Sequence, residues 1–248
     1  MSIWGKIIGG TAGFALGGPL GAILGVVAGH AFVDKTKKPD MQTRKQVAFT
    51  AGVIVLAAKM AKADGVVRDE EIHAFRKVFH PILGEQVAEA EVARIFNVAK
   101  KDSSGFEPYA QQLSEMFSNN PEVLEELLSC LFLIARADNV YHSRENEYLE
   151  SVARIFGLGE AAFRRIRSTH GVDKPDPYEV LGVSRNISDE KLKNEYRKLV
   201  RAHHPDTLIA QGVPQEFVES ANDKLAIIND AYDRIKKERK VICADDPL

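Results

Sequence analysis

Two adjacent histidines, a proline and an aspartate form the sequence HHPD at residues 203–206, directly after a run rich in lysine and arginine. His203, His204 and Asp206 could ligate a metal ion or act as acid and base in catalysis. A metal site needs a third ligand, and a catalytic pair needs a nucleophile with its own supporting motif. The neighbouring sequence offers neither, so we predict no catalytic residue, no metal and no cofactor here. A surface that docks a partner remains as the third possibility.

Three predicted helices position this motif. Asp176 caps a short helix with Pro177 at its first position and Gly182 at its end. Ser188 caps a second helix, in which Leu192, Tyr196 and Leu199 share one apolar face. The opposite face carries Lys191, Lys193, Arg197, Lys198 and Arg201. A third helix, at about residues 215–237, turns its apolar residues back toward the second. The pattern predicts an antiparallel helix pair with a basic face and HPD in the connecting loop.

Four motifs in order, DPYEVLGV, YRKL, HPD and IINDAYDRI, resemble the J domain of DnaJ-type co-chaperones. The resemblance implies a J domain over residues 176–248 that docks on an Hsp70 chaperone (DnaK) and stimulates its ATP hydrolysis, with the ATP site on the partner. The resemblance also implies which residues contact the Hsp70: Tyr196, Arg197, Lys198, Lys193, His204, Pro205 and Asp206. Two departures are visible. Thr207 stands where the family usually has lysine, and the loop from Thr207 to Pro214 is longer than usual.

The central segment, residues 40–168, has apolar residues at helical spacing and few strand signals, with predicted breaks at DG, HPILG, SSG, NNP and GLG, which indicates six or seven helices. An internal repeat aligns AKADGVVRDEE (61–71) with ARADNVYHSRE (135–145). The repeated acids could bind a cation, or they could cap the turns and helix N-termini, which we favour because each turn supplies few ligands. These acids are Asp64, Glu71, Asp138 and Glu145. The paired turns resemble the tellurite-resistance TerB family, which implies an all-α domain.

The first 34 residues read as a membrane anchor, because residues 7–33 contain no Asp, Glu, Lys or Arg. As one helix this stretch would be ~40 Å long and would span the bilayer with tilt. A glycine recurs at every fourth position, which predicts close packing between the anchors of a homodimer. The stripe comprises Gly9, Gly13, Gly17, Gly21, Gly25 and Gly29. A signal peptide is less consistent with the length, and a hairpin broken at residues 17–19 is the remaining alternative.

The flanking charges orient the anchor. Lys35, Lys37, Lys38, Arg44 and Lys45 follow it, whereas only Lys6 precedes it. The positive-inside rule then predicts a single pass with the N-terminus in the periplasm and the later domains in the cytoplasm. A linker over residues 169–175 separates the two later domains. The formal net charge of −2 gives no general reason to expect nucleic-acid binding. Cys130 lies in an apolar run that predicts a buried thiol, and it forms no metal or disulfide motif with the distant Cys243.

The order of anchor, TerB-like domain and J domain resembles the membrane-anchored DnaJ-like co-chaperones of Gram-negative bacteria. That resemblance implies a co-chaperone, not an enzyme, at the bacterial inner membrane, in contact with lipid and with an Hsp70. A second hypothesis is a membrane stress or metal-response module, in which the TerB-like acids sense and the J domain responds.

Overall fold

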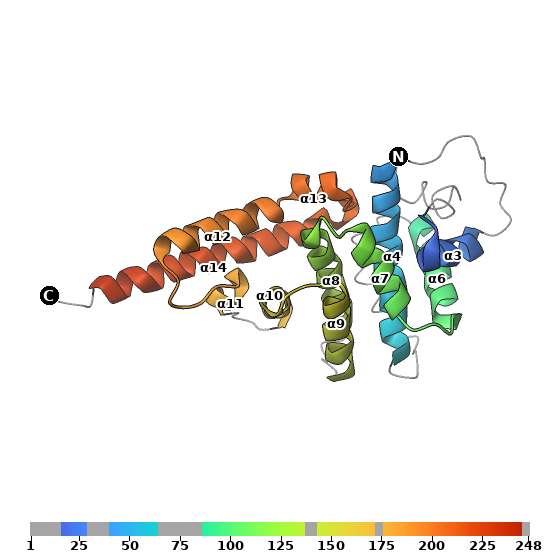
Figure 1. The fold of residues 1–248 in the computed structure, drawn as a ribbon, viewed down its shortest axis with the longest axis horizontal. Helices are drawn as coiled ribbons and strands as arrows, with labels where there is room; N and C mark the ends of the chain where they lie inside the picture. The colour runs from blue at the N-terminus through green and yellow to red at the C-terminus, as the bar shows by residue number, and fades with distance from the viewer. Residues whose placement is uncertain (1–15, 29–39, 64–85, 137–142, 172–175, 245–248) are drawn as a thin grey trace.

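The computed structural model describes residues 16–28, 40–63, 86–136, 143–171 and 176–244 of the chain. All regular elements within these ranges are helices, which confirms the all-α prediction. The helices from α3 to α9 form a bundle, and α12 and α14 form a long antiparallel pair that extends away from it (Figure 1). The HPD motif therefore lies where this pair meets the bundle.

Helix α4 (Met41–Ala63) is the centre of the bundle. Every residue from 47 to 60 is buried, because neighbouring helices surround α4. Such a helix is apolar around its whole circumference rather than on one face. Its neighbours are α6 (Gln86–Lys101), α7 (Glu107–Met116), α8 (Pro121–Ala135) and α9 (Ser143–Ile155), with α10 (Glu160–Gly171) packed on α8.

Two contacts show how tightly α4 is enclosed. A Cβ atom on Gly52 would lie 2.7 Å from the Leu113 side chain, so glycine permits the close approach of α4 and α7. The buried Lys59 ammonium lies 2.7 Å from the Asp102 carboxylate and donates to two backbone carbonyls in the α6–α7 connection. The hydrogen bond from Lys59 lowers the pKa of Asp102, so a charged carboxylate compensates the one ammonium within the buried stretch 47–60.

The predicted chain breaks SSG, NNP and GLG all fall between helices. SSG separates α6 from α7, and NNP places Pro121 at the first position of α8. Gly157 in GLG has φ +69°, a left-handed conformation that follows the end of α9. The predicted breaks DG and HPILG, and with them Gly65, lie outside the described residues.

The described part of the apolar N-terminal segment, residues 16–28, is packed on the bundle. Helix α3 (Gly18–Ala28) buries Leu20, Leu24 and Val27 in the bundle core, next to α4, α6 and α7. Gly17 and Gly18 have φ of +62° and +61°, so the helix does not continue through residue 17 as a straight span would. The Gln112 side chain accepts from Leu20 N–H and donates to the Gly17 carbonyl at this break. Over the ranges that the structure describes, no helix is long and apolar enough to cross a bilayer.

The C-terminal part contains α11 (Pro177–Leu181), α12 (Asp189–Ala202), α13 (Pro205–Gln211), the 3₁₀ helix η1 (Gln215–Phe217) and α14 (Val218–Ala244). The predicted third helix thus begins near its expected start and runs seven residues beyond residue 237. Leu192, Leu199, Ile228 and Ile235 join α12 to α14 in a second small core. Asp176 caps α11 by accepting from Tyr178 N–H at 3.1 Å, and Gly182 ends it with φ +65°, as predicted.

Candidate functional site

The basic side chains of α12 share an exposed face. Ser188 caps the helix by accepting from Lys191 N–H at 3.4 Å, and Leu192 and Leu199 are buried beneath it. All five predicted basic residues, Lys191, Lys193, Arg197, Lys198 and Arg201, are exposed. A cationic surface of this kind favours encounter with an acidic partner.

Tyr196 joins the two long helices. Its ring stacks on the ring of Tyr232 with centroids 4.0 Å apart and planes 6° apart. Its hydroxyl donates to Asn229 Oδ1 at 3.0 Å, so both ends of the side chain are bound to α14. Tyr196 therefore stabilises the surface that carries Lys193, Arg197 and Lys198, whatever further contact it makes with a partner.

The HPD motif forms the start of a helix rather than the expected loop. His203 ends α12, and His204 caps α13 by accepting from Asp206 N–H at its Nδ1 atom, 3.2 Å away. Pro205 occupies the first helical position, where a missing N–H costs nothing. The side chains of His204 and Asp206 are 50% and 89% exposed, so the motif faces solvent.

Helix α13 covers residues 207–211 of the loop predicted from Thr207 to Pro214, and this stretch is seated in the bundle. Leu208, Val213 and Phe217 are fully buried in the same core as α4 and α8. Gly212 has φ +115°, and a Cβ atom there would lie 2.5 Å from Lys45 Cβ. Glycine is therefore required where α13 meets α4. Gln42 also donates to the Ile209 carbonyl, and Gln211 to Glu122 on α8.

Two consecutive carboxylates of α8 reach the J-like part beside this seat. Arg165 of α10 donates to both oxygens of Glu125, at 2.7 and 2.6 Å, and His203 Nε2 lies 3.4 Å from Glu125 Oε2. Burial alone would raise the pKa of Glu125, but the contact with His203 and the charge of Arg165 outweigh it and lower the pKa to about 2. The next residue, Glu126, accepts from the Lys224 ammonium of α14 at 2.7 Å.

Sequence reasoning did not identify Glu125, Glu126, Arg165 or Lys224 as functional residues. A signal for the first two was present, because both acids interrupt the apolar sequence PEVLEELLSCLFLIA. A helix that is apolar on every side is buried, and any acid within it needs a cation from a neighbouring element. Their partners lie 40 or more positions away along the chain and could not be inferred from spacing.

Comparison with known proteins assigns this architecture. Residues 1–47 match the family described as "Co-chaperone DjlA transmembrane domain", residues 50–168 match "Tellurite resistance protein TerB", and residues 176–241 match "DnaJ domain". A co-chaperone protein DjlA from Photobacterium profundum is 32% identical, over 96% of this chain and 99% of the relative. The chain belongs to the DjlA co-chaperone family. DjlA proteins from Coxiella burnetii and Escherichia coli are 29% and 26% identical, each over 96% of this chain. No solved structure matches the chain.

The match of residues 1–47 to the DjlA transmembrane domain supports the interpretation of the N-terminal segment as a membrane anchor. Of the glycine stripe, Gly17, Gly21 and Gly25 are described, and Gly9, Gly13 and Gly29 lie outside the described residues. A Cβ atom on Gly25 would meet nothing within 4 Å, so this position faces open space. Pairing of two anchors remains a prediction.

The repeated acids of the TerB-like domain fall mostly outside the described ranges of this DjlA-family chain. Asp64, Glu71 and Asp138 are not described, and Glu145 lies half-exposed in the first turn of α9, where an acid suits the helix N-terminus. Within the described ranges, no group of three or more His, Cys, Asp or Glu residues could hold a metal ion. The cation hypothesis stays untested at the three other positions.

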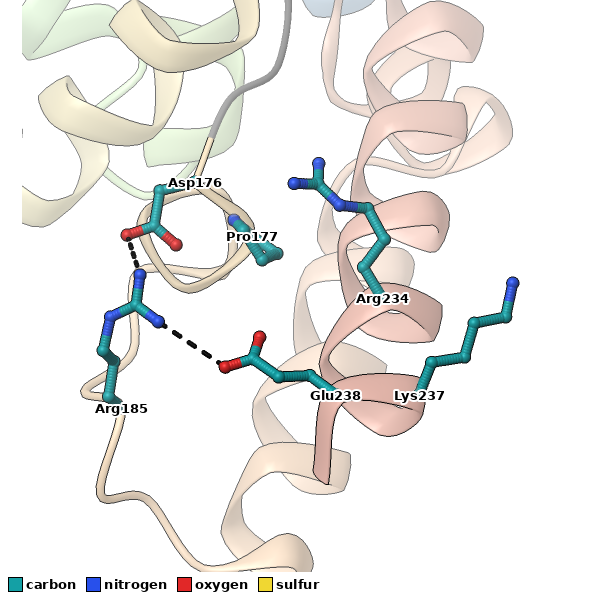
Figure 2. Close-up of a pocket in the computed structure, with 6 residues that line it drawn as sticks. All are labelled: Asp176, Pro177, Arg185, Arg234, Lys237 and Glu238. Atoms are coloured by element: carbon teal, nitrogen blue, oxygen red, sulfur yellow. Dashed lines mark hydrogen bonds and ion pairs between the residues drawn. The ribbon is translucent and has the colours of Figure 1, made fainter. Parts of the chain in front are cut away.

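Figure 2 shows the opposite end of the DjlA-family J domain, where α11 meets α14. Arg185 lies between two carboxylates, 2.9 Å from Asp176 and 3.7 Å from Glu238, and its guanidinium packs over the ring of Tyr178. These contacts tie the start of the domain to the C-terminal half of α14. The pocket that these residues line with Arg234 and Lys237 therefore lies among contacts that stabilise the helix pair, and it is remote from the HPD end of α14.

Proposed function

We propose that this chain is an inner-membrane co-chaperone that docks through its J domain on a cytoplasmic Hsp70 (DnaK) and stimulates its ATP hydrolysis. The observation that carries the proposal is the presentation of HPD. His204 and Asp206 project to solvent at the end of the helix whose exposed face carries Lys193, Arg197 and Lys198. Membership of the DjlA co-chaperone family supports the same function.

The chemistry assigned to these residues follows from their types. The basic face of α12 attracts an acidic surface of the Hsp70 and orients the encounter. Pro205 fixes the backbone of the motif, and the exposed Asp206 carboxylate accepts charge-assisted hydrogen bonds from donors of the Hsp70. ATP and the hydrolytic groups belong to the partner. Thr207 leaves the motif one positive charge short of the usual family pattern, which weakens attraction without removing these contacts.

The decisive experiment measures ATP turnover by purified DnaK with the detergent-solubilised full chain. Asp206→Asn should abolish stimulation, because it removes the charge of the exposed acceptor and leaves the fold unchanged. The matched control is Asp233→Asn, the same change at an exposed position of α14, which should stimulate like the native chain. Native stimulation by Asp206→Asn, or none by the native chain, would overturn the proposal.

We further propose that the anchor leaves the TerB-like and J domains on the cytoplasmic side. The support is the excess of lysine and arginine at residues 35–45 over the single Lys6 before the anchor. A reporter enzyme that is active only in the cytoplasm should be active when it is fused after Leu248. Activity of a periplasmic reporter at the same position would reverse the orientation.

A further inference from the structure

The HPD motif is held between two residues that are buried against the TerB-like domain. His203, directly before the motif, has a side chain that is 1% exposed, whereas the His204 side chain is 50% exposed. Leu208, two positions after Asp206, is fully buried. Between these two buried residues, His204 and Asp206 are exposed and Pro205 is half-buried, so the backbone direction of HPD is set by contacts on both of its sides.

The residue before the motif, His203, contacts the carboxylate of Glu125, which Arg165 holds in place. Both oxygens of Glu125 are held by Arg165, which is itself buried and comes from the neighbouring helix α10. The same carboxylate faces His203 Nε2 at 3.4 Å. A side chain fixed by two hydrogen bonds within one domain is a rigid reference for the residue that it meets in the other.

The contacts after the motif anchor α14, the last J-domain helix, to the same helix α8. Glu126 binds the Lys224 ammonium of α14 at 2.7 Å, and both groups are buried. Consecutive residues of α8 therefore meet the end of α12 and the first half of α14. The spacing of these two helices at the HPD end is set by a helix of the TerB-like domain.

We propose that Glu125 is a positioning residue for the Hsp70-stimulating motif, and that it acts through His203 to hold HPD in its productive direction. This inference rests on the proposed function and assigns the TerB-like domain a part in it. Glu125 binds Arg165 and faces His203, whereas the basic side chains of α12 that attract the Hsp70 are exposed, so the encounter and the direction of HPD depend on different residues. Loss of the Glu125–His203 contact leaves docking in place and misdirects the tip.

The experiment compares full-length variants for both the maximum DnaK stimulation and the chain concentration that gives half of it. Glu125→Gln and His203→Leu should each lower the maximum by at least about tenfold, since small misplacements of acting groups cost this much. The half-saturating concentration should stay within about twofold, because uniform binding is unchanged. A merely structural role would do the reverse, since a partly unfolded sample raises the half-saturating concentration and keeps the maximum.

Two controls isolate the contact. Glu147→Gln makes the same substitution in the same domain, at an exposed position of α9 away from His203 and from the seat of α13, and should keep the native maximum. His203→Gln retains an amide donor toward Glu125 and should restore most of the stimulation lost in His203→Leu. This pair tests the link even where Glu125→Gln does not accumulate as folded protein.

A double variant tests whether Glu125 acts through His203. Glu125→Gln combined with His203→Leu should stimulate no less than His203→Leu alone, because both changes break one link. Native stimulation by Glu125→Gln and His203→Leu, while Asp206→Asn is inactive, would overturn the positioning role and leave the proposed function intact. A native chain that does not stimulate DnaK would instead overturn the proposed function.

Discussion

The ring of Phe217, just before α14, meets the ring of Phe49 in α4 edge-on, with centroids 5.0 Å apart and planes at 70°. Both side chains are fully buried, although one belongs to the J domain and the other to the TerB-like domain. The two domains therefore share one apolar core at this point, in addition to the separate small core between α12 and α14.

Truncation of Phe217 should destabilise both domains together. Phe217→Ala removes a buried aromatic ring and leaves a cavity against α4, which should cost roughly 3–5 kcal/mol in the free energy of unfolding. Urea unfolding of the full chain, followed by circular dichroism, measures this loss. Phe217→Leu is the matched control and should cost less, because it fills part of the space. A cost below about 1 kcal/mol for Phe217→Ala would contradict a shared core.

The buried Lys224–Glu126 pair should be costly to break and cheap to replace. Lys224→Met takes the ammonium away from a buried carboxylate and should lower the free energy of unfolding by roughly 3–5 kcal/mol. Replacing both partners, as Lys224→Met with Glu126→Leu, should recover most of that loss, since no charge then stays buried. Thermal unfolding of the two variants beside the native chain gives both values. A double variant less stable than Lys224→Met alone would refute this account.

Acid should destabilise the chain in two successive ranges of pH. Burial, assisted by the charge of Lys224, lowers the pKa of His170 from 6.5 to about 4. The unfolded chain thus takes up this proton first, and the stability due to neutral His170 is present above pH 6.5 and lost as the pH falls to about 4. Glu125, with its pKa lowered from 4.5 to about 2, contributes stability that is present above pH 4.5 and lost below it.

Replacement of His170 isolates the first range. The imidazole stacks against Phe132 with planes 12° apart, so His170→Phe keeps a flat ring in place. Denaturant unfolding measures the free energy of unfolding as the pH falls from 6.5 to 4. In His170→Phe this free energy should fall less than in the native chain, by a difference of at most about 3 kcal/mol. An unchanged loss over this range would assign the acid sensitivity to other groups, and the loss below pH 4.5 should persist in either chain.

The glycine stripe of the anchor should support self-association in membranes. Gly21→Leu and Gly25→Leu place bulky side chains where two backbones would approach and should weaken dimers, whereas Ala15→Leu, off the stripe, should not. Gly17→Leu is a poor probe, because φ +62° at this position strains any side chain. Crosslinking of single-cysteine variants in vesicles measures the association. Equal crosslinking in Gly21→Leu, Gly25→Leu and Ala15→Leu would show that the glycine stripe does not form the dimer interface.

Sequence patterns predicted the parts of the fold that depend on neighbouring residues. The 3.6-residue spacing of Leu192, Tyr196 and Leu199 placed the basic face of α12, and Pro121 and Gly157 marked helix boundaries correctly. The apolar run around Cys130 predicted a buried thiol, and burial indeed raises its pKa well above the ordinary value. Each of these features is decided within one or two helical turns.

Features that depend on distant residues were missed. Thr207–Pro214 reads as a loop because a seven-residue helix followed by Gly-Val-Pro has little stability of its own. Leu208 makes α13 a helix only because the bundle provides a seat for it. The local pattern of His204 as cap, Pro205 at the first position and Asp206 in the first turn was nonetheless a helix-start signal. No such signal paired Glu125 with His203 or Glu126 with Lys224.

Helix α14 has a practical consequence for labelling the protein. Its 27 residues extend ~40 Å from a start near HPD to Ala244 at the far end of the molecule (Figure 1). A fluorophore or affinity handle attached beyond Ala244 is therefore carried away from both the motif and the TerB-like domain. Immobilisation through this end would leave the docking surface facing solution, which suits the chain to surface-based measurements of chaperone binding without redesign.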